Sequence, residues 1–168
     1  LLLRGAMVGF TGLFSAPELF ALARRDDVES RLVVRDGAYW SLAHGPFRRA
    51  DFKSLPARHW TLLVQGVNLV DPAGDALLRR FSFLPFARLD DLMVSYAAPG
   101  GGVGPQFDSY DVFLVQGAGR RLWRLARPRP FALVAHAPLS LIDDFRTEEE
   151  FVLEPGDMLY LPPGGGHV

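Results

Sequence analysis

Two short segments carry residues whose types and spacing suit a metal site. Gln106 and Asp108 follow a glycine-rich loop, and alternate side chains of an extended segment point to the same side. Both can therefore face one metal ion, while Phe107 between them turns into the core. Together with the remote His167, this is the layout of the facial triad of non-haem iron oxygenases, which is two histidines and one carboxylate. Gln106 then stands where the first histidine is expected.

The spacing of Gly156, Pro162, Gly164 and His167 is the strongest signal in the chain. It resembles the second conserved motif of the cupin superfamily, in which a strand delivers a histidine into the mouth of a β-barrel after a Pro/Gly turn. We therefore predict that His167 is a metal ligand. The alternative interpretation is a surface histidine in a glycine-rich tail.

Composition limits the class of fold and of function. The 168 residues, 49% of them hydrophobic, can bury one substantial core but are too few for two ordinary domains. Seventeen Gly and 13 Pro separate short apolar runs, which favours a mainly β fold with few helices.

A net charge of -1 argues against general nucleic-acid binding, although arginines cluster between Arg120 and Arg129. Without cysteine, a metal must be held by histidine, carboxylate or amide, and the protein is expected to be cytoplasmic.

The two ends of the chain suggest a piece of a longer protein. No apolar stretch approaches the roughly 20 residues of a membrane span, and the leading leucines are followed at once by Arg4, so no membrane partner is expected. The chain opens without Met inside an expected strand and stops one residue after His167. We expect truncation at both ends.

Local patterns predict the elements that position these residues. A capping box at Ser15 predicts a helix to about Arg25, and Asp71 can cap a second helix that runs to Phe81. A hairpin is predicted over 31–42, with its turn at Asp36-Gly37. Residues 61–69 indicate a buried strand or a helix start, and further strands are predicted over 92–97, 111–116, 120–125, 151–153 and 158–161. Gly117–Gly119 is expected to turn the strand over 111–116 back onto the strand over 120–125.

A longer resemblance begins at the glycine-rich loop. Residues 99–116, PGGGVGPQFDSYDVFLVQ, followed by Gly119-Arg120-Arg121, resemble the bacterial ribosomal oxygenases, the JmjC-type arginine hydroxylases of a large-subunit ribosomal protein. Residues 44–47 and 90–93 extend the resemblance over nearly the whole chain. It implies a double-stranded β-helix (jelly roll, JmjC/cupin type) with a few flanking helices, incomplete at the C-terminus. We predict a single domain over 1–168, with an N-terminal flank over 1–85 and the jelly-roll core over 86–168.

The resemblance also implies roles for individual residues. Asp108 and His167 match the iron ligands, and the family has its other histidine where this chain has Gln106. Arg121 falls where the family binds the distal carboxylate of 2-oxoglutarate, a task that suits the fork of a guanidinium. Arg120 is expected to point the other way.

Two further positions match those that contact the substrate arginine in the family, namely Asp91 and Tyr110. A carboxylate and a phenol are suitable partners for a guanidinium. The resemblance implies Fe(II) as metal, 2-oxoglutarate as co-substrate, a large-subunit ribosomal protein as partner and a homodimer for the full-length family. The remaining histidines and the tryptophans are interpreted as structural, surface or rim residues: His44, His59, His136, Trp40, Trp60 and Trp123.

Three functions compete. The first is an Fe(II)/2-oxoglutarate-dependent arginine hydroxylase, and the second is an inactive relative that still binds a protein partner through the same groove. A different cupin, such as a small-molecule isomerase or a sugar-binding module, is disfavoured by Arg121 and by the long match around Gln106. Three explanations for Gln106 remain open. The chain is a natural family member that has lost or altered its chemistry, the glutamine is an introduced substitution, or another residue completes the metal site.

Overall fold

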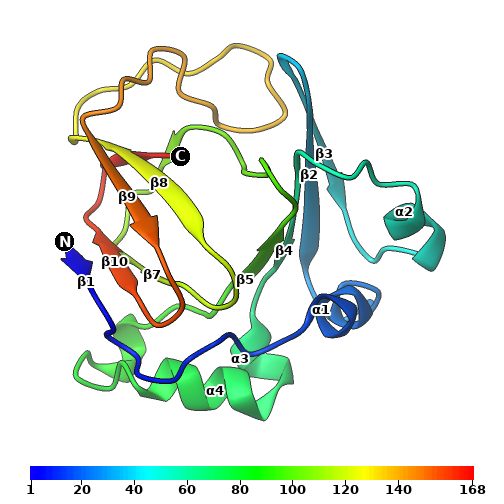
Figure 1. Ribbon diagram of the computed structural model, residues 1–168, viewed down its shortest axis with the longest axis vertical. Coiled ribbons are helices and arrows are strands. Elements are labelled where there is room, and N and C mark those ends of the chain that lie inside the picture. The colour runs from blue at the N-terminus through cyan, green and yellow to red at the C-terminus, as the bar shows by residue number, and fades with distance from the viewer. The chain divides into compact units, whose positions relative to one another are not determined.

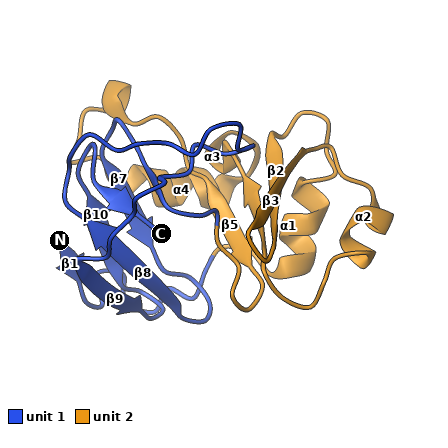
Figure 2. Ribbon diagram, turned by 90° about the horizontal axis from the view of Figure 1, so that it is seen from above, with its two compact units in different colours: residues 1–12, 103–168 blue, residues 13–102 orange.

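The computed structural model describes all 168 residues, which group into two compact units. Unit 1 comprises Leu1–Gly12 and Val103–Val168, and unit 2 comprises Leu13–Gly102 (Figure 2). All eleven strands pair in antiparallel sheets and the helices are short, so the prediction of a mainly β fold is confirmed. The single domain with a boundary at residue 85 stays a prediction.

Unit 2 consists of one antiparallel sheet, in the order β3-β2-β4-β5, and short helices. Its elements are α1 (Ala16–Leu22), β2 (Ser30–Asp36), β3 (Tyr39–His44), α2 (Arg49–Lys53), β4 (Trp60–Val64), α3 (Val67–Val70), α4 (Pro72–Arg79), the 3-10 helix η1 (Phe86–Arg88) and β5 (Val94–Ala97). Every residue of β4 is buried, which explains its uninterrupted apolar run. Trp60, Leu62 and Val64 pack in one core cluster with Leu19 of α1.

The two helix starts predicted from capping residues are confirmed. The backbone N–H of Ser15 donates to Glu18 Oε2 at 2.7 Å before α1, and the backbone N–H of Ala73 donates to Asp71 Oδ1 at 2.8 Å before α4. Each helix ends two or three residues earlier than predicted, because turn-like hydrogen bonds replace the helical pattern at its C-terminal end.

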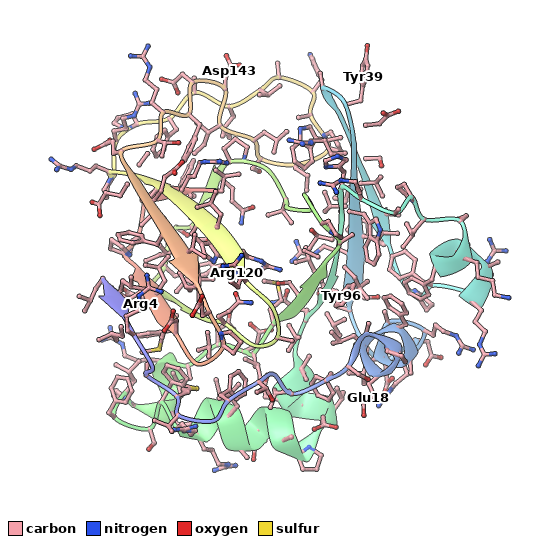
Figure 3. All side chains as sticks on the ribbon, in the orientation of Figure 1. Arg4, Glu18, Tyr39, Tyr96, Arg120 and Asp143 are labelled. Atoms are coloured by element: carbon pink, nitrogen blue, oxygen red, sulfur yellow. The ribbon has the colours of Figure 1, made fainter.

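The predicted hairpin forms from β2 and β3, but its turn lies one residue later than predicted. Asp36 pairs with Tyr39 at the tip of the hairpin (Figure 3), which leaves Gly37 and Ala38 as the two-residue turn. Gly37 has a φ of 59°, and a tight hairpin turn needs positive φ at such a position. The left-handed turn therefore starts at the glycine, and Asp36 extends the strand.

The glycine-rich loop after β5 packs against the start of β4. A Cβ added to Gly101 would collide with the carbonyl oxygen of Trp60, whereas a Cβ on Gly102 would meet nothing within 4 Å. We predict that Gly101→Ala lowers the free energy of unfolding by about 2 kcal/mol, since overpacking against backbone forces the chain to shift. Denaturant unfolding measures the change. Gly102→Ala is the matched control and should change stability by less than about 0.5 kcal/mol; equal losses in both variants would contradict the prediction.

Unit 1 contains seven strands in two antiparallel sheets, in the orders β1-β10-β7 and β6-β11-β8-β9. They are β1 (Leu2–Leu3), β6 (Gln106–Phe107), β7 (Val112–Val115), β8 (Arg121–Ala126), β9 (Glu149–Leu153), β10 (Met158–Leu161) and β11 (Gly166–His167). Leu153 of β9 and Leu159 and Leu161 of β10 form one buried cluster, against which Leu114 of β7 and Leu125 of β8 pack. Strands of both sheets therefore share this core.

Most strands that follow one another in unit 1 belong to different sheets, and β8 with β9 is the exception. The prediction that 111–116 pairs with 120–125 is wrong: β7 pairs with β10, and β8 pairs with β9 (Figure 1). On its other side β8 pairs with β11. The turn from β9 to β10 also crosses from one sheet to the other. The glycines at 117 and 119 thus make a crossing between sheets, and alternating polarity within a strand does not identify its partner.

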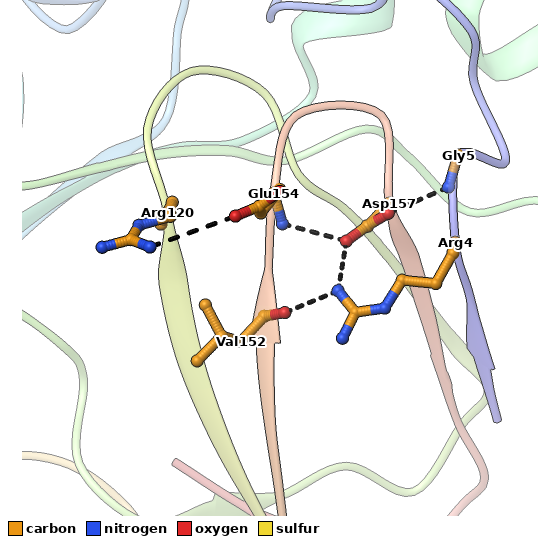
Figure 4. A network of polar contacts seen from close by, with 6 residues as sticks. All are labelled: Arg4, Gly5, Arg120, Val152, Glu154 and Asp157. Carbon is orange, nitrogen blue, oxygen red and sulfur yellow. Dashed lines mark hydrogen bonds and ion pairs between the residues drawn. The ribbon is translucent and has the colours of Figure 1, made fainter.

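A buried carboxylate holds the turn between β9 and β10. Asp157 Oδ2 accepts from Arg4 Nη1 at 2.6 Å and from the backbone N–H of Glu154 at 3.0 Å, and its Oδ1 accepts from the backbone N–H of Gly5 at 2.9 Å (Figure 4). Arg4 also donates to the carbonyl oxygen of Val152. Asp157 thus ties the N-terminal segment to the turn that precedes the strand leading to His167.

No helix of the structure combines the length and the apolarity that crossing a bilayer requires.

Candidate functional site

Strand register in unit 1 brings the predicted metal residues to one face. His167 of β11 pairs with Gln106 of β6 on one side and with Leu125 of β8 on the other. Directly opposite residues of an antiparallel pair project from the same face of the sheet. Because Leu125 packs on the core cluster, His167 and Gln106 face inward with it, and Asp108 follows two residues after Gln106.

The side chains of Gln106 and Asp108 both approach the Nε2 atom of His167. Gln106 Nε2 lies 3.3 Å from it, and Asp108 Oδ2 lies 3.6 Å from it. The His167 side chain is 5% exposed and that of Asp108 is 26% exposed, so the group is shielded but reachable. The structure therefore brings together all three residues that the sequence predicted for the metal.

Burial favours the neutral form of the His167 imidazole. Burial lowers the pKa of His167, although the carbonyl of Gly165 and the Asp108 carboxylate act in the opposite direction. The Nδ1 atom lies 3.2 Å from the carbonyl oxygen of Gly165, to which an Nδ1–H can donate. In that tautomer Nε2 presents a lone pair toward Gln106 and Asp108, which is the form that binds metals.

A divalent cation fits between these donors. Two ligands that are each about 2.1 Å from an ion and at right angles are about 3.0 Å apart, close to the separations found around His167 Nε2. A lone pair and a carboxylate oxygen that face each other without a proton between them also favour a cation. Throughout the 168 residues, no group of three or more His, Cys, Asp or Glu side chains is arranged to hold a metal ion. The third polar side chain beside His167 and Asp108 is the amide of Gln106.

Phe107 corrects the prediction of an inward-facing core residue. It is 37% exposed, and its ring stacks on Phe131 with centroids 5.6 Å apart. Phe107 pairs with Gly166, where an added Cβ would also meet Phe131. Phe131 thus covers the outer face of this sheet edge, and Phe107 packs there because the inner face is occupied by Gln106 and its partners.

Arg121 and Arg120 differ in the way that strand alternation predicts. Arg121 begins β8 opposite the buried Leu153, and burial lowers the pKa of its guanidinium. Arg120 is exposed, 4.0 Å from Glu154 (Figure 4). Arg121 therefore belongs to the same inner face as His167, and Arg120 lies outside it.

Trp123 is a site residue that the sequence reasoning placed only in the core or at the rim. Its ring centroid lies 6.0 Å from that of His167, and the guanidinium carbon of Arg121 lies 5.8 Å from its centroid. One indole thus contacts both the predicted metal ligand and the predicted carboxylate-binding arginine. Alternation in β8 contains this signal, because Trp123 is two residues from Arg121.

Asp91 and Tyr110, the predicted substrate contacts, lie in different units and are described separately. In unit 2, Asp91 Oδ2 accepts from Gln65 Nε2 and from the backbone N–H of Gly66, both at 2.8 Å. Asp91 lines a hollow of about 380 Å³ whose other carboxylates are Asp27, Glu29 and Asp90. In unit 1, Tyr110 is 61% exposed.

Sequence comparisons connect this geometry to known proteins. Residues 76–168 match the family model described as the JmjC domain. The chain is 45% identical over 161 residues to the ribosomal protein uL16 3-hydroxylase of Escherichia coli (strain K12), which covers 94% of this chain. It is 34% identical over 171 residues to a probable ribosomal oxygenase of Haemophilus influenzae, which covers 99% of this chain. The chain spans 42% of the length of each of these two relatives.

Solved structures agree with the sequence matches. An X-ray structure of E. coli YcfD superposes with a TM-score of 0.94 at 43% identity, covering 99% of this chain and 45% of that chain. The same ribosomal oxygenase in complex with cobalt and 2-oxoglutarate gives a TM-score of 0.88 at 42% identity, covering 99% of this chain and 43% of that chain. The predicted JmjC/cupin jelly-roll fold is thereby confirmed.

Proposed function

Because this chain belongs to the JmjC domain family and its relatives are ribosomal oxygenases, we propose that it hydroxylates an arginine of a large-subunit ribosomal protein, using Fe(II) and 2-oxoglutarate. The single observation that carries the proposal is the convergence of Gln106, Asp108 and His167 on the inner face that also bears Arg121. The name of the E. coli relative makes uL16 the first substrate to test.

The proposed roles follow from the chemistry of each group. His167 Nε2, the Asp108 carboxylate and the Gln106 amide hold the metal, and the related structure with cobalt and 2-oxoglutarate supports that pairing of cofactor and co-substrate. When bound, Fe(II) and 2-oxoglutarate supply the oxidation: dioxygen and 2-oxoglutarate yield succinate, carbon dioxide and one oxygen atom added to a side-chain carbon. Arg121 binds the distal carboxylate of 2-oxoglutarate through two parallel hydrogen bonds and so orients it.

Asp91 and Tyr110 are proposed to bind the substrate arginine. The Oδ2 atom of Asp91 already accepts two hydrogen bonds, which fixes the orientation of the carboxylate and directs Oδ1 to a guanidinium. The exposed ring of Tyr110 offers a flat face and a hydroxyl. We further propose that the protein works beside the ribosome in the cytoplasm, and as a homodimer at full length, as the resemblance to the family implies.

A second candidate function follows from Gln106. An amide oxygen is a weaker ligand for iron than an imidazole nitrogen, and no other His, Cys, Asp or Glu completes the site. This favours a catalytically silent relative that binds its ribosomal partner without modifying it.

Turnover with a uL16-derived, arginine-containing peptide distinguishes the two candidates. We predict that Gln106→His raises the rate of hydroxylation by roughly 10–100-fold, because even the loss of outer-shell support typically costs that much in metal affinity or activity. The assay uses the protein at its full natural length with Fe(II) and 2-oxoglutarate, and mass spectrometry detects the added oxygen. Slow hydroxylation by the native protein supports the oxygenase. Hydroxylation only by Gln106→His supports the silent relative, and no hydroxylation by either protein contradicts the oxygenase.

A further inference from the structure

We propose that Gln106 is a metal ligand through its amide oxygen, and that it shifts the selectivity of the site toward oxygen-preferring divalent cations such as Mn(II). This inference deepens the proposed function and rests on its placement of a metal at Asp108 and His167. The proposed ligands are one glutamine, one aspartate and one histidine, whereas the usual facial triad has two histidines and one carboxylate.

The position of Gln106 carries the first step. Its side chain is fixed opposite His167 by the pairing of β6 with β11, and its terminal amide nitrogen lies 3.3 Å from His167 Nε2. Adjacent ligands of an octahedral ion of this size are about 3.0 Å apart. The amide thus reaches the coordination position without a change of backbone, and a water molecule is not needed to bridge it.

The second step is a rotation of the amide group. In the structure, an N–H of the Gln106 amide can donate to the lone pair on His167 Nε2, which satisfies both groups. Rotation about the last side-chain torsion exchanges the two ends of the amide and presents Oε1, an acceptor, at the same place. A cation between His167 and Asp108 favours that exchange, because it attracts both the amide oxygen of Gln106 and the lone pair of His167 Nε2, which no longer accepts a hydrogen bond.

The chemistry of the donors then sets the selectivity. Imidazole nitrogen suits Fe, Cu, Ni and Zn, whereas carboxylate, carbonyl and water oxygens suit Mg, Ca and Mn. A site with one imidazole, one carboxylate and one amide oxygen loses more affinity for the nitrogen-preferring ions than for Mn(II). The relative affinity for Mn(II) and Co(II) therefore reports the ligand at position 106.

Direct metal titration tests the proposal without relying on catalysis. Manganese(II) and cobalt(II) chlorides are titrated into the native protein and into Gln106→His and Gln106→Ala, and tryptophan fluorescence quenching and calorimetry give the dissociation constants. Trp123 is a suitable reporter because its ring lies 6.0 Å from that of His167. We expect Gln106→His to tighten Co(II) binding by roughly 10–100-fold and Mn(II) binding by less than about 5-fold. We expect Gln106→Ala to weaken Mn(II) binding by about 10-fold.

Two matched variants control the experiment. Gln116→Ala removes a glutamine of the same unit whose Nε2 donates to the carbonyl oxygen of Ala118, and it should leave both dissociation constants unchanged. Trp123→Phe should remove most of the quenching while calorimetry still detects binding. Circular dichroism verifies that each variant is folded.

The outcomes separate this inference from the proposed function. Unchanged Mn(II) affinity in Gln106→Ala, or equal tightening of both ions in Gln106→His, would overturn the amide ligand, even if the protein hydroxylates its peptide. If Gln106→His binds metal and the native protein binds none, the proposal is also overturned. The amide would then prevent metal binding and would not be a ligand. The expected affinities without hydroxylation in the mass assay would support the amide ligand and count against the oxygenase.

Discussion

Replacing Arg121 by methionine is expected to weaken 2-oxoglutarate binding by about 100-fold while the protein stays folded. The guanidinium lies on the inner face of β8, partly buried beside Trp123, where water competes less for a bound carboxylate. Hydrogen bonds between charged groups contribute about 1.5–3 kcal/mol, and a bidentate pair lies at the upper end of that range. Methionine retains the apolar stem and removes the charge. Calorimetric titration of 2-oxoglutarate into the Mn(II)-loaded protein measures the effect.

The neighbouring arginine supplies the control for Arg121. Arg120 is exposed, and its ion pair with Glu154 at 4.0 Å contributes little to stability. Arg120→Met should therefore change 2-oxoglutarate affinity by less than about 2-fold. Arg121→Lys should give an intermediate loss, because an ammonium group cannot form the two-pronged contact. Equal losses at both positions would indicate a general effect of net charge and would contradict the role of Arg121.

Much of the fold could be predicted because its signals are local. The helix starts at Ser15 and Asp71 depend on residues within one turn, and the apolar run in β4 reflects burial of the whole strand. Strand partners could not be predicted in this way. The strands β7 and β8 are adjacent in sequence but join different sheets, whereas β8 and β9 are also adjacent and pair with each other. Period-two alternation identifies the inner face of a strand and carries no information on its neighbour.

The candidate site was more predictable than the packing around it. Alternation alone places Gln106 and Asp108 on one side, and the turn before β11 delivers His167 beside them. The error at Phe107 arose because β6 is a two-residue edge strand whose outer face is covered by a distant loop residue, Phe131. The contact of Trp123 with His167 cannot be predicted from the sequence of β8 alone, since it depends on the pairing of β8 with β11.

Replacing Asp157 by alanine is expected to lower the Tm by roughly 5–10 °C. The carboxylate is almost fully buried and accepts hydrogen bonds from Arg4 and from the backbone N–H groups of Gly5 and Glu154. Without it, both N–H groups lose their partner and Arg4 loses its countercharge. Because this contact fixes the turn that leads through β10 toward β11, metal affinity at His167 should fall along with the Tm. Thermal unfolding followed by circular dichroism measures the change.

The same carboxylate predicts a specific response to acid. The backbone N–H of Glu154, that of Gly5 and then Arg4 lower the pKa of Asp157 to about 2 from an ordinary value of 3.8. A lowered pKa in the folded state means that the ionised carboxylate stabilises the protein above about pH 4, and that this contribution is lost as the pH falls toward 2. The difference in Tm between the native protein and Asp157→Asn should therefore be constant above about pH 4 and shrink below it. Asp144→Asn, which removes an exposed partner of Arg129, should show no such convergence. A difference that persists at pH 2 would mean that the carboxylate stabilises the turn through its shape instead of its charge.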